Sequence, residues 1–392
     1  MAFQSRATGD IAEQDLLALI NDRVPEDRTL DYKAELPGSS NGARREFVAD
    51  VTSFANTNGG HILYGMDEEQ GIATALIGLP NLDPDAEVLR LEGILANGCE
   101  PRIPGLAIRA IPVTRGDVAI LVAIPRSWTR PHQDKVDDDR RFYGRNAGGK
   151  YRLDVAELRS FFSVSEGTGQ RIRQFQAERL AAINAGETPV PLRGYAKVIL
   201  HVIPFGAFDT RSLIDPATVR DRYAARLYPL YSTGYNHRYN FAGVITFSGD
   251  RPNDPTVTSY LQLFRDGSIE TVTTGLFDED YVPSAALERA LIESVGNSLA
   301  LQESLGLAPP ALVTISIVGI AGFRFIVGGN RRLSSLGVRP IEEVALHFPD
   351  IIVENMATPP AALLRPIFDA LWNAAGLPRA LSYDDATGEY VG

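Results

Sequence analysis

One stretch near residue 56 restricts the fold of this chain more than any other, because a helix pattern changes to a strand pattern there. Between residues 42 and 57 apolar side chains recur at helical spacing, with Phe47, Val51 and Phe54 on one face. The pattern stops at Asn58-Gly59-Gly60, where a glycine can end a helix in the left-handed conformation. Residues 61–66 then form a short apolar run, which is typical of a strand. The junction predicts a domain that mixes helices and strands.

Helix and strand patterns alternate through the rest of the first half. Helices are expected at residues 10–24, 85–97, 155–162 and 170–185, and strands at 29–33, 72–78, 106–114, 118–124 and 141–146. The strand at 72–78 is expected to pair with 61–66 across a polar turn at 67–71. Residues 126–139 are expected to form an exposed loop. These elements predict a mixed α+β domain at residues 1–165, with flanking helices around a mixed sheet.

A second α+β domain is predicted at residues 190–392, after a helical linker at 166–189. Glycine and proline in the run Gly186-Glu187-Thr188-Pro189 interrupt regular structure there. Strands are expected at 196–203, 241–247, 260–264, 269–273, 312–318 and 323–327, and helices at 284–304 and 361–375. This second domain is of no recognised type, and we expect it to serve dimerisation or to hold a partner or substrate.

The charge and cysteine content exclude several classes of protein. With 38 Lys and Arg against 49 Asp and Glu, the formal net charge is −11, so any nucleic-acid binding must use a local basic patch. The single cysteine, Cys99, can form neither an intramolecular disulfide nor a cysteine-rich zinc site. No stretch approaches the roughly 18–20 continuous apolar residues of a membrane span. We therefore expect a cytoplasmic protein with no membrane partner.

Three stretches of the first half together resemble a known domain family. They are EDRTLDYK at residues 26–33, FANTNGGHILYG at 54–65, and RFYGRN at 141–146 followed by VAEL at 155–158. In this order they resemble the AlbA-like domain of the Schlafen family, called AlbA_2 and formerly described as a divergent AAA family. The FANTNGGHILYG run is the most specific part, and the resemblance extends over residues 15–165. It implies an AlbA_2-like mixed sheet with flanking helices.

The resemblance also implies a three-carboxylate catalytic site at Glu26, Asp31 and Asp67 that holds Mg²⁺ or Mn²⁺. Hard carboxylate oxygens are the ligands that such ions prefer, and phosphodiester cleavage can use them. Lys33 follows Asp31 by two residues, so on a strand both side chains point to the same face. Its ammonium group could orient the attacking water or stabilise the developing phosphorane charge. We therefore include Lys33 among the catalytic candidates.

Two features of this carboxylate set keep alternatives open. Position 31 is an aspartate where the family more often has glutamate, so its carboxylate reaches a shorter distance. Asp67, Glu68 and Glu69 are consecutive, so any of the three could be the third ligand. A solvated acidic turn explains the same residues without any metal.

The segment from residue 126 to 152 has the composition of a nucleic-acid-binding surface. The segment contains eight cationic residues and four aspartates, with aromatic residues between them. The candidate nucleic-acid-binding residues are Arg126, Arg130, Arg140, Arg141, Tyr143, Arg145, Lys150 and Arg152. Arg145 is the strongest candidate, because it matches the arginine of the family motif. The alternative is a solvated basic hairpin whose aromatic residues belong to the core.

Smaller motifs point to no further site. Residues 236–238 and 330–332 could extend a nucleic-acid surface, although exposed loops explain them equally well. Asn56 and Thr57 beside the two glycines could contact a phosphate, but the end of a helix repels anions and the turn is better explained as structural. The chain has no G-x-x-x-x-G-K-[ST] run, so no P-loop ATP site is expected. The histidines show no zinc-ligand spacing.

The resemblance implies a metal-dependent endoribonuclease that acts on structured RNA such as tRNA, in antiphage defence. Two alternatives stand beside it. One is a non-catalytic regulatory protein that binds DNA or RNA through the basic segment, and the other is a protein-interaction module with a partner protein in a defence system. A homodimer is also expected, because Schlafen proteins of eukaryotes combine two related lobes whereas this chain shows one.

Overall fold

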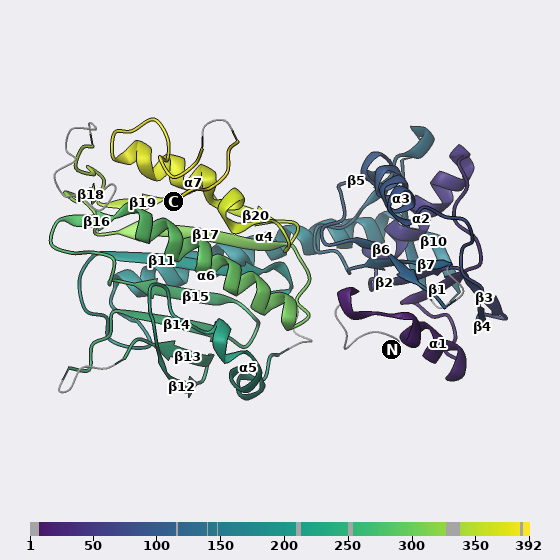
Figure 1. Cartoon of the computed structure of the whole chain (residues 1–392), viewed down its shortest axis with the longest axis horizontal. Helices are drawn as coiled ribbons and strands as arrows, with labels where there is room; N and C mark the ends of the chain where they lie inside the picture. Colours follow the sequence, from purple (N-terminus) through teal and green to yellow (C-terminus); the bar gives the residue numbers. More distant parts are fainter. Residues whose placement is uncertain are drawn as a thin grey trace. The chain divides into compact units, whose positions relative to one another are not determined.

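The computed structural model describes residues 8–114, 117–138, 140–146, 148–208, 213–249, 254–326, 338–384 and 387–392. The chain forms two compact units, Met1–Gly169 and Gln170–Gly392 (Figure 1). Across the described ranges, a search of the helices finds no segment with the length and apolar character needed to cross a membrane.

The first unit combines four helices with three small sheets. Its helices are α1 (Glu13–Asn21), α2 (Asn41–Asn56), α3 (Pro84–Gly98) and the first part of α4 (Val155–Asn184), with short 3-10 segments at Thr8–Asp10 and Val136–Asp138. The main sheet has the order β1 (Leu30–Lys33), β2 (Gly60–Tyr64), β7 (Val118–Ile124) and β6 (Ala107–Pro112). A second sheet has the order β10 (Gly149–Arg152), β9 (Arg141–Asn146), β8 (Gln133–Asp134) and β5 (Cys99–Glu100). The strands β3 (Met66–Glu69) and β4 (Ile72–Leu76) form a separate antiparallel pair.

The main sheet is covered on both faces, and this fixes the direction of each side chain. Strands β1 and β2 are parallel, so the chain must cross over between them, and α2 is that crossover. One face of the sheet packs against α2 and α3 and the other against α1, as Figure 1 shows. Leu30 and Tyr32 of β1 belong to the α1 side. Because side chains alternate along a strand, Asp31 and Lys33 point to the α2 side.

The second unit is built on one large antiparallel sheet. Its strand order is β12 (Asn236–Asn240), β13 (Gly243–Phe247), β14 (Ser259–Phe264), β15 (Ile269–Thr273), β11 (Lys197–Pro204), β17 (Ala311–Val318) and β19 (Ala345–His347), with β20 (Ile351–Val353) also paired to β17. The remaining elements are α5 (Pro216–Tyr223), α6 (Ser284–Ser304), α7 (Pro360–Ala374), 3-10 segments at Phe205–Phe208 and Ala224–Arg226, and the parallel pair β16 (Tyr281–Pro283) and β18 (Arg324–Ile326). Helices α5, α6 and α7 cover one face, and the residues of α4 from Gln170 onward cover the other (Figure 1).

A buried polar network ties α4 to this large sheet. Glu270 of β15 has a fully buried side chain and accepts hydrogen bonds from both Arg179 Nε and Arg179 Nη2, at 2.8 and 2.9 Å. Tyr260 Oη donates to the same carboxylate at 2.8 Å, and His201 Nε2 lies 3.0 Å from it. A buried carboxylate is stable only when it is paired and hydrogen-bonded in this way.

The predicted α+β class is confirmed in both units. The helices predicted at 42–57, 85–97, 284–304 and 361–375 correspond to α2, α3, α6 and α7 within a few residues at each end. In contrast, the helices predicted separately at 155–162 and 170–185 are one continuous helix, α4. Residues 236–238, which an exposed loop also explained, belong to strand β12, and residues 330–332 lie outside the described part of the chain.

The strand pairing predicted for residues 61–66 is corrected by the structure. Strand β4 pairs with β3, whereas β2 pairs with β1 and β7. Gly65 separates β2 from β3 and has a positive φ of 85°, which changes the chain direction after Tyr64. Residues 67–69, which were predicted to lie in a polar turn, therefore belong to β3 and pair with β4 in a separate sheet.

Candidate functional site

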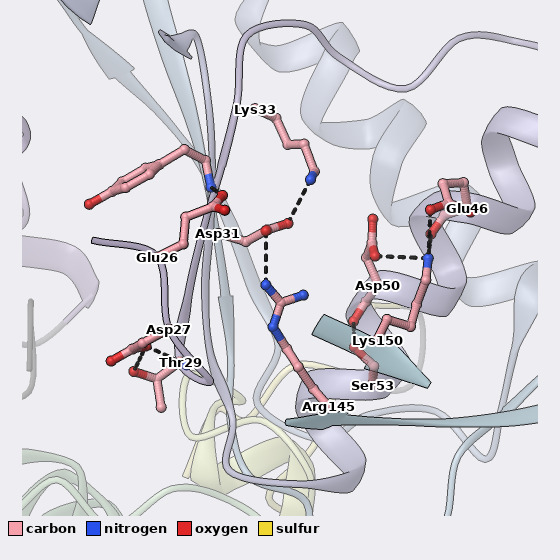
Figure 2. Close-up of polar contacts among 11 residues, drawn as sticks. Glu26, Asp27, Thr29, Asp31, Lys33, Glu46, Asp50, Ser53, Arg145 and Lys150 are labelled. Atoms are coloured by element: carbon pink, nitrogen blue, oxygen red, sulfur yellow. Dashed lines mark hydrogen bonds and ion pairs between the residues drawn. The ribbon is translucent and has the colours of Figure 1, made fainter. Parts of the chain in front are cut away.

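A polar pocket of about 470 Å³ lies between strand β1 at the edge of the main sheet, helix α2 and the β9–β10 hairpin. Its lining residues are Glu26, Asp27, Asp31, Lys33, Glu46, Asp50, Arg145, Asn146, Gly148, Gly149 and Lys150. Figure 2 shows Lys33 and Arg145 directed toward Asp31, and Lys150 directed toward Glu46 and Asp50. We call it the carboxylate pocket, since five acidic side chains outnumber three cationic ones.

Asp31 is the central carboxylate of the pocket. Arg145 Nη2 donates a hydrogen bond to Asp31 Oδ1 at 2.9 Å, and Lys33 Nζ forms an ion pair with Oδ2 at 3.0 Å (Figure 2). Burial by itself would raise the pKa of Asp31, but the positive charges of Arg145 and Lys33 outweigh it and lower that pKa. The Arg145 guanidinium also lies over the Phe54 ring, 4.3 Å from its centroid, which fixes its orientation. Asp31 is thus ionised and held from two sides.

Glu26 lies beside Asp31 and is held by the backbone. Tyr32 N–H donates to Glu26 Oε1 at 2.7 Å, and Glu26 N–H donates to the Gly71 carbonyl at 2.6 Å. Burial raises the pKa of Glu26, the hydrogen bond from Tyr32 opposes the rise, and the negative charge of Asp31 adds to it. The two carboxyl groups therefore interact directly as neighbours.

A second ion-pair group closes the other side of the pocket. Lys150 Nζ lies 2.7 Å from Glu46 Oε1 and 2.9 Å from Asp50 Oδ1 (Figure 2). Burial raises the pKa of Asp50, although the Lys150 charge opposes the rise. Burial would lower the pKa of Lys33, but Asp31 outweighs it and Asp50 also contributes, so that pKa is raised. Lys33 therefore lies in the field of both carboxylates and stays protonated.

The structure brings together some of the predicted catalytic residues and separates one of them. Glu26, Asp31 and Lys33 all line the pocket, whereas Asp67 does not. Asp67 is exposed on β3, where its Oδ1 accepts a hydrogen bond from Glu68 N–H at 3.1 Å. The change of direction at Gly65 carries Asp67 into the separate β3–β4 pair. The third carboxylate facing Asp31 and Lys33 is instead Asp50 of α2, which sequence reasoning did not select.

The β9–β10 hairpin presents its cationic side chains on one face. Lys150 is paired with Arg145 and Arg152 with Tyr143, so these four side chains share a face of the hairpin. Lys150 Nζ also lies 5.8 Å from the Tyr143 ring centroid. Arg145 and Lys150 are thus part of the pocket, and Arg152 is exposed on the same face.

The remaining predicted basic residues have diverse surroundings. Arg130 is buried and donates to the carbonyls of Asn56 and Thr57 at 3.3 and 3.2 Å, so it caps the end of α2. Its assignment as a nucleic-acid contact is corrected by this burial. The Arg126 guanidinium lies over the Trp128 ring at 5.0 Å, Arg140 is exposed, and Arg141 is partly buried on β9.

The most specific sequence motif, FANTNGGHILYG at residues 54–65, has a structural role. Asn56 is fully buried, donates from Nδ2 to the carbonyls of His132 and Tyr143 at 3.0 and 2.8 Å, and accepts from His132 N–H at 2.7 Å. A Cβ on Gly59 would lie 2.4 Å from Arg126 N, and one on Gly60 would lie 2.3 Å from the Thr29 carbonyl oxygen. Only glycine allows these backbone approaches. The Asn-Thr-Asn-Gly-Gly turn therefore joins α2 to β1, β8 and β9.

The two histidines and the cysteine of this unit are uncharged at neutral pH. Burial lowers the pKa of both His61 and His132 to about 4, and it raises the pKa of Cys99 to about 12. His132 Nδ1 lies 2.8 Å from the Pro101 carbonyl, and Cys99 Sγ contacts the same oxygen at 3.2 Å. Neither imidazole carries a charge at neutral pH, and Cys99 is a thiol.

The donor set of the pocket suits a divalent cation only in part. Across the described ranges, no group of three His, Cys, Asp or Glu side chains could hold a metal ion, so the predicted set of Glu26, Asp31 and Asp67 is not assembled. Glu26 and Asp31 nevertheless provide two adjacent carboxylates. Mg²⁺ commonly binds through one or two carboxylates and takes its other ligands from water and substrate phosphates. This pair fits such an ion, and Asp67 does not contribute.

Comparison with known proteins agrees with the family resemblance of the first half of the chain. Residues 26–154 match the family model described as Schlafen, AlbA_2. A solved structure, the DIP2311 protein from Corynebacterium diphtheriae, aligns with 20% identity over 38% of this chain and 28% of its own length, with a TM-score of 0.26. This chain therefore corresponds to less than a third of that protein. No curated protein matches the sequence.

The first unit is an α+β domain whose mixed-charge pocket lies beside a basic hairpin, which is the kind of surface that contacts nucleic acid. More specifically, residues 26–154 are a Schlafen AlbA_2 domain. This domain indicates a family that interacts with nucleic acid, and it accounts for the first unit alone.

Proposed function

We propose that this protein is an endoribonuclease that binds structured RNA, with tRNA as the expected class, and cleaves it in the carboxylate pocket. The observation that carries the proposal is the assembly of Glu26, Asp31 and Lys33 with Arg145 and Lys150 in one pocket. Paired carboxylates next to fixed cations are the groups that phosphodiester cleavage requires. The phosphate backbone would approach from the hairpin side, where Arg152 and Tyr143 continue the cationic face.

Each side chain has a defined part in this proposal. Lys33 and Arg145 are positioned to neutralise a phosphate that binds in the pocket, because both side chains line it. Their ion pairs with Asp31 hold them in place before the substrate arrives, so little reorganisation is needed on binding. Asp50 keeps Lys150 directed into the pocket in the same way.

Glu26 and Asp31 are the residues that would hold Mg²⁺ or Mn²⁺. When bound, such an ion supplies Lewis-acid stabilisation of the phosphate and lowers the pKa of a coordinated water.

The proposal is tested with Asp31→Asn and Glu26→Gln in the full chain, incubated with transcribed tRNA and Mg²⁺ or Mn²⁺. We expect each variant to cleave at least 100-fold more slowly than the native protein. Asp67→Asn is the matched control, because it removes an acidic side chain outside the pocket and should cleave at the native rate. Circular dichroism checks that the variants remain folded. Native cleavage by Asp31→Asn and Glu26→Gln would contradict the proposal.

A second candidate function is non-catalytic binding of RNA or DNA in regulation. It is favoured by one observation, the engagement of Asp31 by both Arg145 and Lys33, which leaves the pocket electrostatically paired. Under this alternative, Arg141→Ala and Lys150→Ala weaken binding, and Glu26→Gln leaves it unchanged. Binding measured against salt concentration counts the phosphate contacts, because the logarithm of the affinity falls linearly with the logarithm of salt.

The homodimer, the partner protein and the antiphage role remain predictions from the family resemblance. Light scattering on the purified chain tests the first of them. A monomer at micromolar concentration would contradict it.

A further inference from the structure

A row of aromatic and cationic side chains follows the outer edge of the large sheet in the second unit. Strand β12 is the first in the strand order and pairs with β13 on its inner side, next to α5 (Figure 1). Between residues 220 and 241 the sequence has five tyrosines, one phenylalanine and four arginines against one aspartate. This local excess of positive charge occurs in a chain whose net charge is −11.

We call five side chains of this segment the tyrosine edge: Arg220, Tyr228, Tyr235, His237 and Tyr239. The rings of Tyr228 and Tyr235 meet edge to face with centroids 5.0 Å apart, and those of His237 and Tyr239 do so at 6.0 Å. Arg220 of α5 is exposed and adds a positive charge to the group.

Much of the aromatic ring surface in this group is exposed to solvent and does not pack in the core. Tyr228 is 41% exposed and Tyr239 is 51% exposed. Phe241, at the turn between β12 and β13, is 98% exposed. Phe241 therefore contributes almost no buried surface to folding, and it adds to a run of exposed aromatic residues next to cations, an arrangement typical of binding surfaces.

The arginines of the segment differ in how far they are used by the fold. Arg226 donates to Ser304 Oγ at 2.9 Å and so ties its segment to α6. Arg220 forms an exposed ion pair with Asp221 at 2.9 Å, which contributes little stability in water. Arg222 is exposed as well. Arg220 and Arg222 are therefore the cations that can turn toward a ligand at small cost.

We propose that the tyrosine edge, together with Phe241, binds single-stranded nucleic acid by stacking bases on its exposed rings. Every base has a π face, so exposed aromatics on one strand accept successive unpaired bases without sequence preference. Arg220 and Arg222 supply the charge that the phosphates require. The surface shares no residue with the carboxylate pocket and extends nucleic-acid contact to the second unit.

A second copy of the chain fits this edge less well. Open strands can pair with one another, but two copies would bring the same positively charged segment face to face. Like charges at such a contact repel, whereas a polyanion is attracted. We therefore assign the surface to nucleic acid.

The test measures binding of a fluorescein-labelled 12-nucleotide oligouridylate by anisotropy, using the full chain. The double variant Tyr239→Ala with Phe241→Ala is expected to bind about five-fold or more weakly, the lower end of what stacking contributes per base. Tyr239→Phe keeps the ring and should bind as the native protein does. Tyr195→Ala is the matched control, since Tyr195 is an exposed tyrosine, 75% accessible, outside the tyrosine edge.

Crosslinking separates this inference from the proposed nuclease function. A 4-thiouridine oligonucleotide irradiated on the native protein should crosslink within residues 228–241. Crosslinks confined to residues 126–152, or native affinity of the double variant, would overturn the inference and leave the carboxylate pocket proposal in place. A change of the double variant from dimer to monomer, with native RNA affinity, would assign the edge to a second copy instead.

Discussion

Arg145 Nη2 donates to Asp31 Oδ1 over 2.9 Å, and the two residues are 114 positions apart in the sequence. The contact joins the β9–β10 hairpin to the edge strand of the main sheet. Both side chains are buried, with 8% and 6% of their surface exposed. We therefore expect the contact to stabilise the first unit as well as to fix the Arg145 guanidinium in the pocket.

Replacing Arg145 by alanine should destabilise the first unit. Asp31 would keep only Lys33 as a cationic partner. Removing one partner of a buried carboxylate lowers the free energy of unfolding by about 3 kcal/mol. Unfolding in urea, followed by circular dichroism, measures the change. Arg152→Ala removes an exposed arginine from the same hairpin and should cost less than about 0.5 kcal/mol. Equal effects of the two substitutions would show that the buried ion pair contributes nothing.

Asn56→Ala should destabilise the protein by about 2–3 kcal/mol, because it leaves a buried N–H and two buried carbonyls without partners. Hydrogen exchange at the His132 amide reports the loss directly, since that amide donates to Asn56 Oδ1. Asn97→Ala removes an exposed side-chain hydrogen bond on α3 and serves as the control. Unchanged protection of the His132 amide would contradict the structural role of Asn56.

His132 makes stability depend on pH in the acidic range. Its pKa is about 4 in the folded protein and about 6.5 in the unfolded chain, so the unfolded state binds the proton first as the pH falls. The contribution is present above pH 6.5 and is lost progressively toward pH 4. Between pH 7.5 and 4.5, His132→Gln should lose roughly 2–3 kcal/mol less stability than the native protein. A titration of the His132 ring by NMR with a midpoint near 6.5 would rule this out.

Arg179→Ala should destabilise the second unit by about 3 kcal/mol, because it removes two hydrogen bonds from the fully buried Glu270 carboxylate. Combining Arg179→Met with Glu270→Gln should recover part of this loss, since no buried charge then lacks its partner. Arg173→Ala, on an exposed position of the same helix, gives the background value. The measurement is again denaturant unfolding. A double variant less stable than Arg179→Ala would contradict the explanation.

Local sequence patterns are sufficient for elements whose apolar side chains have a clear period. Helix α6 begins and ends where its spacing predicts, and β9 also has its predicted bounds. Alternation along β1 predicts that Asp31 and Lys33 share one face, and both side chains line the carboxylate pocket. Strand β12 was not predicted as a strand, because its exposed polar and aromatic residues show no apolar alternation.

The parts of the site that sequence reasoning missed depend on tertiary contacts. Asp50 is a polar residue on an amphipathic helix, and helical spacing gives no sign that the hairpin covers it and that Lys150 pairs with it. Arg130 was grouped with the basic residues by composition, but its loop folds back onto the end of α2. Asp67 failed for the opposite reason, since the turn at Gly65 removes it from the sheet edge that its neighbours in sequence suggested. None of these outcomes is encoded in spacing along the chain.

The Asn56 side chain and the two following glycines hold elements together, whereas the charged groups of the pocket come from other segments. A protein could therefore retain the whole Asn-Thr-Asn-Gly-Gly signature and lose the proposed cleavage chemistry through a single change at position 26 or 31. Conversely, a search for the Asn-Thr-Asn-Gly-Gly signature would miss a distant relative that keeps the same carboxylates but has substitutions in the signature. Sorting such proteins into active and inactive groups requires reading positions 26, 31, 33, 50, 145 and 150 as one set.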